Sequence, residues 1–211
     1  GTITEVPNLY LISVGINDYL YNANDLLYAV NDANTFSSGI QSLATPLFNK
    51  ISVINIFNSD ATKDNITKAL NQVKVQAKPW DVFVFYYAGH GVAVDDNGTS
   101  TFYFLPHNVV DFFDYKTLPK VALSTNEFLS YSRDIKADKQ VVIVDACNSG
   151  AVGNIFAYRS GLQEEQLIAV LAQSTGTHFL FASSSNQLAK EIPQFEHGLF
   201  TYAILNAMSG A

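Results

Sequence analysis

Two apolar runs in the sequence each end at a side chain that can take part in acid–base or nucleophilic chemistry. Residues 85–91 read FYYAGHG and carry His90, and residues 142–150 read VIVDACNSG and carry Cys147. A deprotonated cysteine is strongly nucleophilic near neutral pH, and a nearby imidazole can take its proton. The pair therefore indicates covalent catalysis by a thiolate, provided that the fold brings the two residues together.

Small residues flank both of these side chains. Gly89 and Gly91 are expected to let the backbone turn sharply at His90 and to let a substrate approach closely. The backbone amides of Gly91 and Cys147 are expected to face a developing oxyanion, and such donors contribute about 3–4 kcal/mol each. A lone cysteine is more commonly an inert core residue, so the catalytic interpretation depends on this sequence context.

The elements that must position the pair alternate between strands and helices, which is typical of an α/β fold with a mostly parallel sheet. We predict strands at residues 9–16, 51–57, 81–87, 140–145 and 178–183. Helices are predicted at 25–43, 61–77, 164–172 and 199–208, and another follows the capping-box sequence STNE at 124–127. Parallel strands gather their carboxyl ends at one edge, so His90 and Cys147 meet there if their strands are neighbours.

Composition narrows the classes of function. The 211 residues are 48% hydrophobic and 15% charged, which predicts one folded domain rather than disorder. A net charge of −7 argues against nucleic-acid binding, and no apolar run approaches the roughly 18 residues of a membrane span. A single cysteine forms no internal disulfide and fits a reducing, cytoplasmic setting. A chain starting at Gly1 is expected to be part of a longer multidomain protein.

Taken together, the two motifs resemble those of the metacaspases and orthocaspases, which are caspase-like cysteine peptidases. Cys147 lies 57 positions after His90, close to the caspase spacing of about 50, and the Ala-Cys core of the caspase motif is present. The position before that core is Asp145 where caspases have Gln. Further matches are VGIN at 14–17, AVNDA at 29–33 and GLFTY at 198–202, so the resemblance spans about residues 9–208.

This resemblance implies a caspase–haemoglobinase fold, a three-layer α-β-α sandwich with a mostly parallel central sheet of about six strands. It implies a Cys147–His90 dyad without a charged third member, and an oxyanion hole at the amides of Gly91 and Cys147. The whole of 1–211 would form one peptidase domain. Residues 1–150 correspond to the larger part, 151–177 to a candidate processing loop, and 178–211 to the smaller part.

The resemblance also bears on specificity. True caspases cut after Asp and need arginines in the pocket, yet no Arg occurs at 17–18 or at 184–187 here. In metacaspases the positions matching Asp32 and Asp145 line the pocket for the substrate residue before the scissile bond. An anionic pocket rejects acidic side chains and binds basic ones, and Arg can pair with a carboxylate through two hydrogen bonds. We therefore expect a peptide or protein substrate cut after Arg, and less readily after Lys.

Two further expectations follow from the family. Caspase-like enzymes commonly cut themselves after the nucleophile, and Arg159 is the candidate for self-cleavage. Many members need calcium, for which the pairs Asp95 with Asp96 and Asp111 with Asp114 offer oxygen ligands. Neither pair has the spacing of a calcium loop, so we predict that no cofactor is required.

Two alternatives remain at this point. The chain could be a catalytically silent caspase-like module that binds partners, or a CHAT-like or separase-like peptidase within a larger bacterial signalling or defence protein. The CHAT-like and separase-like peptidases share the His-Gly and Asp-x-Cys features, and the intact Cys–His pair weighs against a silent module. Monomeric and dimeric states are equally compatible with the sequence.

Overall fold

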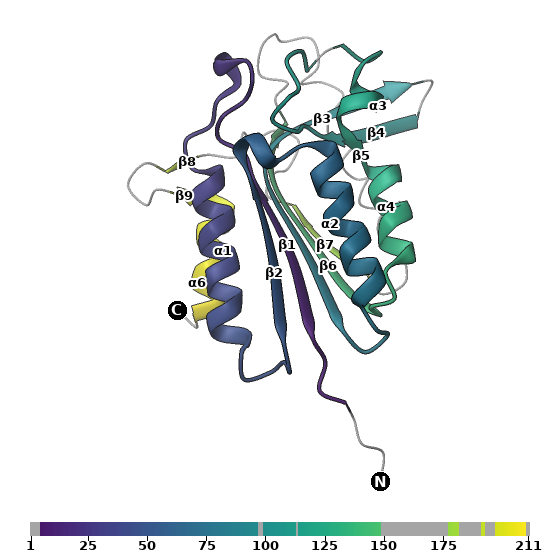
Figure 1. Ribbon diagram of the computed structural model, residues 1–211. Coiled ribbons are helices and arrows are strands. Elements are labelled where there is room, and N and C mark those ends of the chain that lie inside the picture. The colour runs from purple at the N-terminus through teal and green to yellow at the C-terminus, as the bar shows by residue number, and fades with distance from the viewer. Residues whose placement is uncertain are drawn as a thin grey trace.

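A seven-stranded sheet runs through the middle of the computed structural model (Figure 1), which describes residues 5–96, 99–112, 114–148, 177–181, 191–192 and 197–209. Some side chains within these ranges, including those of Cys147 and Asn148, lie outside the description. The strands are β1 (Leu9–Gly15), β2 (Ile51–Phe57), β3 (Val82–Asp96), β4 (Thr99–Phe104), β5 (Leu123–Ser124), β6 (Lys139–Asn148) and β7 (Thr177–Phe181).

Five of the strands are parallel and lie in the order β2-β1-β3-β6-β7. The carboxyl-terminal half of β3 also pairs with β4, and β4 pairs with β5, both antiparallel. The predicted α/β class with a mostly parallel sheet is confirmed, with seven strands instead of about six. Each of the five parallel strands overlaps a predicted strand, because strands covered on both faces have nearly continuous apolar sequences.

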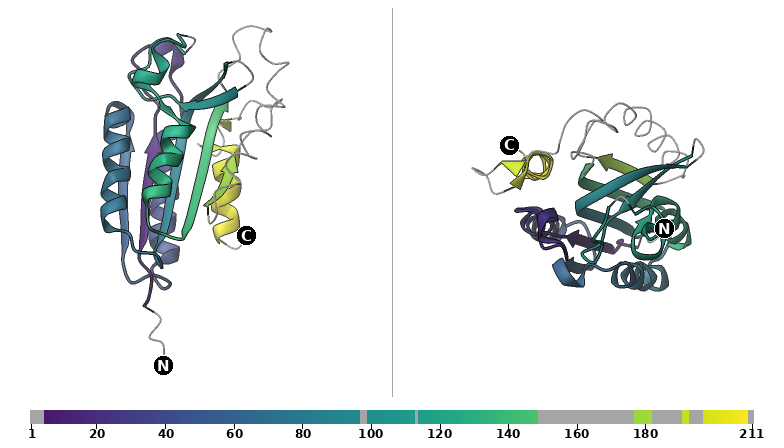
Figure 2. Two further views of the ribbon diagram at one scale, coloured as in Figure 1. Left: turned by 90° about the vertical axis from the view of Figure 1, so that its right-hand side faces the viewer. Right: turned by 90° about the horizontal axis from the view of Figure 1, so that it is seen from above.

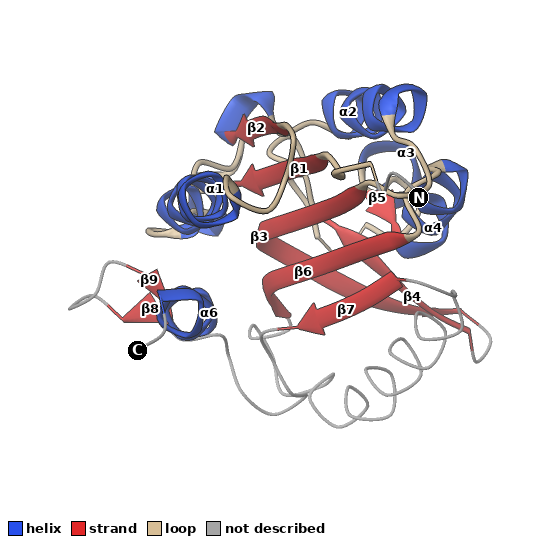
Figure 3. Cartoon of the chain, turned by 90° about the horizontal axis from the view of Figure 1, so that it is seen from below, coloured by secondary structure: helices blue, strands red, loops and turns tan. Residues whose placement is uncertain are grey.

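Helices cover both faces of the sheet (Figures 1 and 3). The helices α1 (Ala29–Ala44) and α6 (Leu199–Ser209) lie on one face, and α2 (Lys63–Gln76) and α4 (Thr125–Asp134) lie on the other. The shorter elements are η1 (Asn22–Asn24), η2 (Asn58–Asp60), α3 (Leu118–Val121) and the pair β8 (Glu191–Ile192) and β9 (His197–Gly198). Figure 2 shows α6 beside α1. The helix predicted at 164–172 lies outside the described residues.

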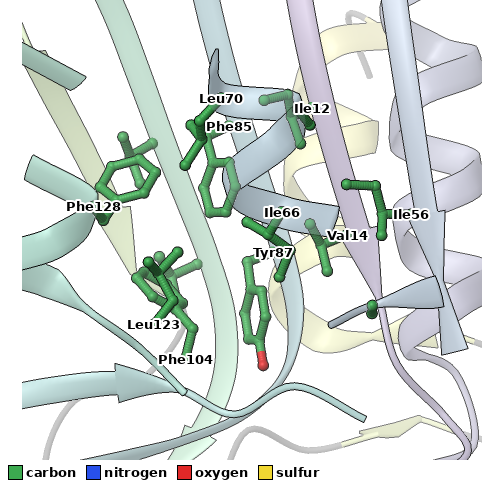
Figure 4. Packing of buried hydrophobic residues seen from close by; sticks show 14 of the residues in the cluster. Ile12, Val14, Ile56, Ile66, Leu70, Phe85, Tyr87, Phe104, Leu123 and Phe128 are labelled. Carbon is green, nitrogen blue, oxygen red and sulfur yellow. The ribbon is translucent and has the colours of Figure 1, made fainter. Parts of the chain in front are cut away.

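The core lies in two clusters, one on each side of the sheet. On β3, alternate residues Phe85 and Tyr87 belong to the cluster under α2 and α4, together with Phe128 of α4 (Figure 4). Val84 and Tyr86 belong to the opposite cluster under α1 and α6. This alternation is the period of a β-strand, and it fixes which side chains of β3 face each layer.

The predicted capping box at the start of α4 is confirmed. The Ser124 hydroxyl accepts a hydrogen bond from the Glu127 amide at 3.2 Å, and the Glu127 carboxylate accepts one from the Ser124 amide at 3.0 Å. Lys63 of α2 forms an ion pair with Glu127 at 2.7 Å. The cap therefore also links the two helices that cover this face.

The predicted end of β3 at Tyr87 is wrong. The strand continues to Asp96, so His90 lies inside it and not in a loop after it. Pairing with β6 extends as far as Gly91 opposite Asn148, and pairing with β4 then runs from Gly91 opposite Phe104 to Asp96 opposite Thr99. These long-range ladders keep the backbone extended through the glycines.

Candidate active site

The two predicted catalytic residues lie opposite each other on neighbouring strands. In the parallel ladder between β3 and β6, His90 pairs with Cys147. Neighbouring strands are about 4.7–4.9 Å apart, so the two backbones are adjacent. For Cys147 the structure describes the backbone pairing and not the side chain.

The imidazole of His90 is 9% exposed and is held by a backbone carbonyl. Its Nε2 lies 2.8 Å from the carbonyl oxygen of Asn24, at the end of η1. A carbonyl oxygen only accepts hydrogen bonds, so Nε2 must carry the proton. In the neutral ring the other nitrogen, Nδ1, is then the basic one. The sequence offered no indication of the Asn24 contact, because a backbone carbonyl has no side-chain pattern.

The glycines beside His90 serve a different purpose from the one predicted. They lie in an extended strand, so no sharp turn occurs there. A Cβ at Gly89 would lie 2.9 Å from the hydroxyls of both Tyr19 and Tyr87. A Cβ at Gly91 would lie 2.1 Å from the ring of Phe102 on β4. The glycines make room for aromatic side chains that pack against the strand.

Asp145 is buried two positions before Cys147 and receives a hydrogen bond from α6. The Thr201 hydroxyl donates to Asp145 Oδ2 at 2.5 Å, and the Tyr86 hydroxyl lies 2.5 Å from the Thr201 oxygen. Because the single Thr201 proton goes to the carboxylate, Tyr86 must donate to Thr201. The result is a buried chain of donors that starts on β3 and ends at Asp145. Sequence reasoning did not single out Thr201 or Tyr86 as members of the site.

Asp32 lies in the same region as Asp145. It is 3% exposed and belongs to the first turn of α1, where the helix dipole favours a negative charge. Burial raises the pKa of Tyr86 well above its usual value, and the charges of Asp145 and Asp32 raise it further. Both carboxylates therefore act on one hydroxyl. The structure brings the two predicted pocket residues together around Tyr86.

The remaining site predictions fall partly outside the described residues. Arg159 lies outside them, as do the side chains of Asp95 and Asp96. Within the described part, no group of three or more His, Cys, Asp or Glu side chains is arranged to hold a metal ion, and Asp111 and Asp114 form no such cluster. Among the same residues, no helix has the length and apolar character needed to cross a membrane.

A histidine and a cysteine paired across parallel strands, within an α/β sandwich, form an arrangement compatible with thiolate chemistry. Residues 10–211 match the family described as Caspase domain (Peptidase_C14). The chain belongs to this caspase domain family. Membership supports a cysteine peptidase activity at the level of the family.

Individual similar proteins agree with this assignment. The chain is 28% identical over 160 residues to Metacaspase-2 of Arabidopsis thaliana, a match that covers 67% of this chain and 34% of that protein. The chain thus spans about a third of the length of that relative. The crystal structure of protein GSU0716 from Geobacter sulfurreducens superposes with a TM-score of 0.67 at 15% identity, covering 97% of this chain and 83% of that one. That likeness concerns the fold alone.

Proposed function

We propose that this chain is a cysteine endopeptidase that hydrolyses peptide bonds after basic residues, with Arg preferred over Lys. Cys147 is the nucleophile and His90 is its general base. The observation that carries the proposal is the pairing of His90 with Cys147 in the β3–β6 ladder. This pairing supports a dyad because it holds the two backbones adjacent without any loop having to move.

The chemistry begins with a proton transfer. Nδ1 of His90 accepts the thiol proton of Cys147, and the thiolate attacks the carbonyl carbon of the scissile bond. The resulting imidazolium then gives the proton to the leaving amine as the C–N bond breaks, which leaves a thioester. Water, deprotonated by the same imidazole, hydrolyses the thioester and restores the thiol. The bond from Nε2 to the Asn24 carbonyl supports this sequence by keeping Nδ1 as the basic nitrogen.

Two backbone amides complete the reacting centre in this proposal. The N–H groups of Gly91 and Cys147 stabilise the oxyanion that forms on the attacked carbonyl. Both residues belong to the adjacent strand segments that carry the dyad. The absence of a side chain at Gly91 supports this role, because a substituent there would displace the ring of Phe102.

The buried carboxylates support the preference for basic residues. Asp32 and Asp145 place negative charge beside the hydroxyl of Tyr86, and Asp145 lies on β6, the strand that carries Cys147. A substrate guanidinium entering this region gains charge-assisted hydrogen bonds, while an acidic side chain would be repelled. Cleavage of this chain at its own Arg159 would use the same specificity. It is part of the proposal as a self-processing step.

The test combines labelling with substrate comparison. A peptide electrophile carrying Arg next to its reactive group should form one adduct, located at Cys147 by mass spectrometry, and Cys147→Ala should form none. Matched fluorogenic peptides that differ only in the residue before the scissile bond should be cleaved fastest after Arg. A protein that forms no adduct and cleaves no peptide would instead be a silent interaction module. Faster cleavage after Asp than after Arg would refute the specificity.

A further inference from the structure

Along β3, His90 lies just beyond the point where pairing with the neighbouring strand β1 ends. Pairing between β1 and β3 ends with Gly15 opposite Ala88, and the Ile16 amide then donates to the Ala88 carbonyl at 3.1 Å. In a parallel ladder every second residue directs its N–H and C=O toward the same neighbour. His90 is two residues after Ala88, so its peptide groups face the side that β1 has left.

Two tyrosine hydroxyls and the Leu105 amide, which donates to the His90 carbonyl at 3.1 Å, fill this position. The His90 amide donates to the Tyr19 hydroxyl at 2.8 Å, and the Tyr87 hydroxyl donates to the His90 carbonyl at 2.8 Å. Tyr19 is 3% exposed and Tyr87 is fully buried. Burial, with Tyr19 as the next cause, holds the pKa of Tyr87 well above its usual value, so Tyr87 keeps its proton. The two hydroxyls crowd the Cα of Gly89, which explains the glycine at that position.

Tyr19 also contacts the imidazole itself. Its ring centroid lies 4.9 Å from that of His90, and the Phe112 ring lies 5.1 Å from His90. Tyr19 and Phe112 pack edge to face at 5.9 Å. Aromatic pairs of this geometry prefer defined orientations, so the two rings restrict the rotation of the imidazole.

Tyr19 also anchors the segment around Asn24, whose carbonyl binds Nε2 of the His90 imidazole. The Tyr19 amide donates to the carboxylate of Asp25 at 2.8 Å. Asp25 directly follows Asn24, whose carbonyl accepts from Nε2 of His90. Tyr19 thus supports His90 through its backbone, its ring and the carbonyl that selects its tautomer.

We propose that Tyr19 is a positioning residue for His90: its hydroxyl accepts the amide hydrogen bond of His90 that β1 no longer takes and, with Phe112, its ring fixes the imidazole with Nδ1 as base. This inference rests on the proposed function for its catalytic consequence only. The held orientation and tautomer of the ring are properties of the folded chain, whether or not a substrate is turned over.

The kinetic test is Tyr19→Phe, which removes the hydroxyl and keeps the ring. Loss of one hydrogen bond of about 1 kcal/mol should lower kcat by about fivefold if it holds the base, with KM unchanged. The matched control is Tyr10→Phe, which removes a partly buried hydroxyl that lies 3.4 Å from the Gln76 carbonyl, at the opposite end of β1. The control should keep the wild-type kcat. An unchanged kcat in Tyr19→Phe, or an equal fall in the control, would overturn the proposal.

The second readout does not depend on activity. In a Cys147→Ala background, long-range proton–nitrogen NMR of the His90 ring should show the Nε2–H tautomer, and adding Tyr19→Phe should increase the share of the Nδ1–H tautomer. Ring resonances that Tyr19→Phe leaves unchanged would overturn the positioning role. If the wild-type protein cleaves no peptide, the proposed function fails, and this measurement alone still decides the role of Tyr19.

Discussion

Replacing Asp145 by Asn tests the proposed specificity most directly. The substitution keeps the size of the side chain and leaves an amide oxygen that can still accept from the Thr201 hydroxyl, now 2.5 Å from the carboxylate. The substitution removes the negative charge and replaces one carboxylate oxygen, which accepts hydrogen bonds, with an NH2 group, which donates them. A substrate guanidinium, which only donates, then loses its partner at this position while the surrounding packing is preserved.

The magnitude follows from the kind of bond that is lost. A hydrogen bond to a charged group contributes about 1.5–3 kcal/mol, which corresponds to about 10- to 150-fold in kcat/KM. The loss should approach the upper end of this range because Asp145 is only 8% exposed, so water screens the interaction poorly. Asp32 keeps one negative charge near Tyr86, and activity toward Arg should therefore fall without disappearing.

The assay compares two peptides that differ only in charge. One carries Arg before the scissile bond, and the other carries citrulline, its neutral analogue of nearly the same shape. Asp145→Asn should reduce kcat/KM for the Arg peptide by about 10- to 150-fold and change the citrulline peptide little. Asp64→Asn, at an exposed position of α2, is the control for net charge. An equal loss on both peptides would show that Asp145 supports the fold or the dyad and does not read substrate charge.

Two further predictions concern the framework of the site. Gly91→Ala should lower the free energy of unfolding by about 1–3 kcal/mol, because its Cβ would meet the Phe102 ring at 2.1 Å, and adding Phe102→Leu should restore part of it in urea titrations. Burial acts to raise the pKa of Glu127, but hydrogen bonds from Lys63 and Ser124 outweigh it and hold the pKa below its usual value. The stability this provides is present above the unfolded value of about 4.3 and is lost as pH falls through the lower folded pKa. Wild-type protein should therefore lose its stability advantage over Glu127→Gln on acidification, and a constant difference would contradict the assignment.

The parallel core of the fold could be read from the sequence, and its antiparallel extension could not. Strands such as β6 are covered on both faces and appear as continuous apolar runs, which periodicity detects. The strands predicted from the sequence do not include β4 (TSTFYF), since its pairing depends on β3 extending beyond Tyr87. That extension is decided by ladders between distant residues, and no local pattern reports it. The prediction that His90 follows its strand failed for this reason.

The candidate site, like the fold, was only partly predictable from the sequence. His90 and Cys147 could be found because each ends an apolar run and the two motifs match a known family. Their partners could not, since the hydrogen bonds of Tyr19 and Asn24 with His90 span 71 and 66 positions, and that of Thr201 with Asp145 spans 56. Contacts of this kind are set by tertiary packing. The nearness of Asp32 to Asp145 was likewise expected from the family resemblance and not from spacing.

One strand register joins the proposed catalysis to the proposed specificity in this chain. The ladder that sets His90 opposite Cys147 also sets Ala88 opposite Asp145. The register is fixed by apolar alternation on β6, where Val142 and Val144 belong to the cluster under α2 and α4 and Ile143 belongs to the opposite cluster. A slip of β6 by one residue would turn Val142 and Val144 toward the cluster under α1 and α6, and Ile143 toward the cluster under α2 and α4. The slip would also separate His90 from Cys147 and move the Asp145 carboxylate away from Thr201. The hydrophobic core that selects the register therefore selects both parts of the proposed site at once.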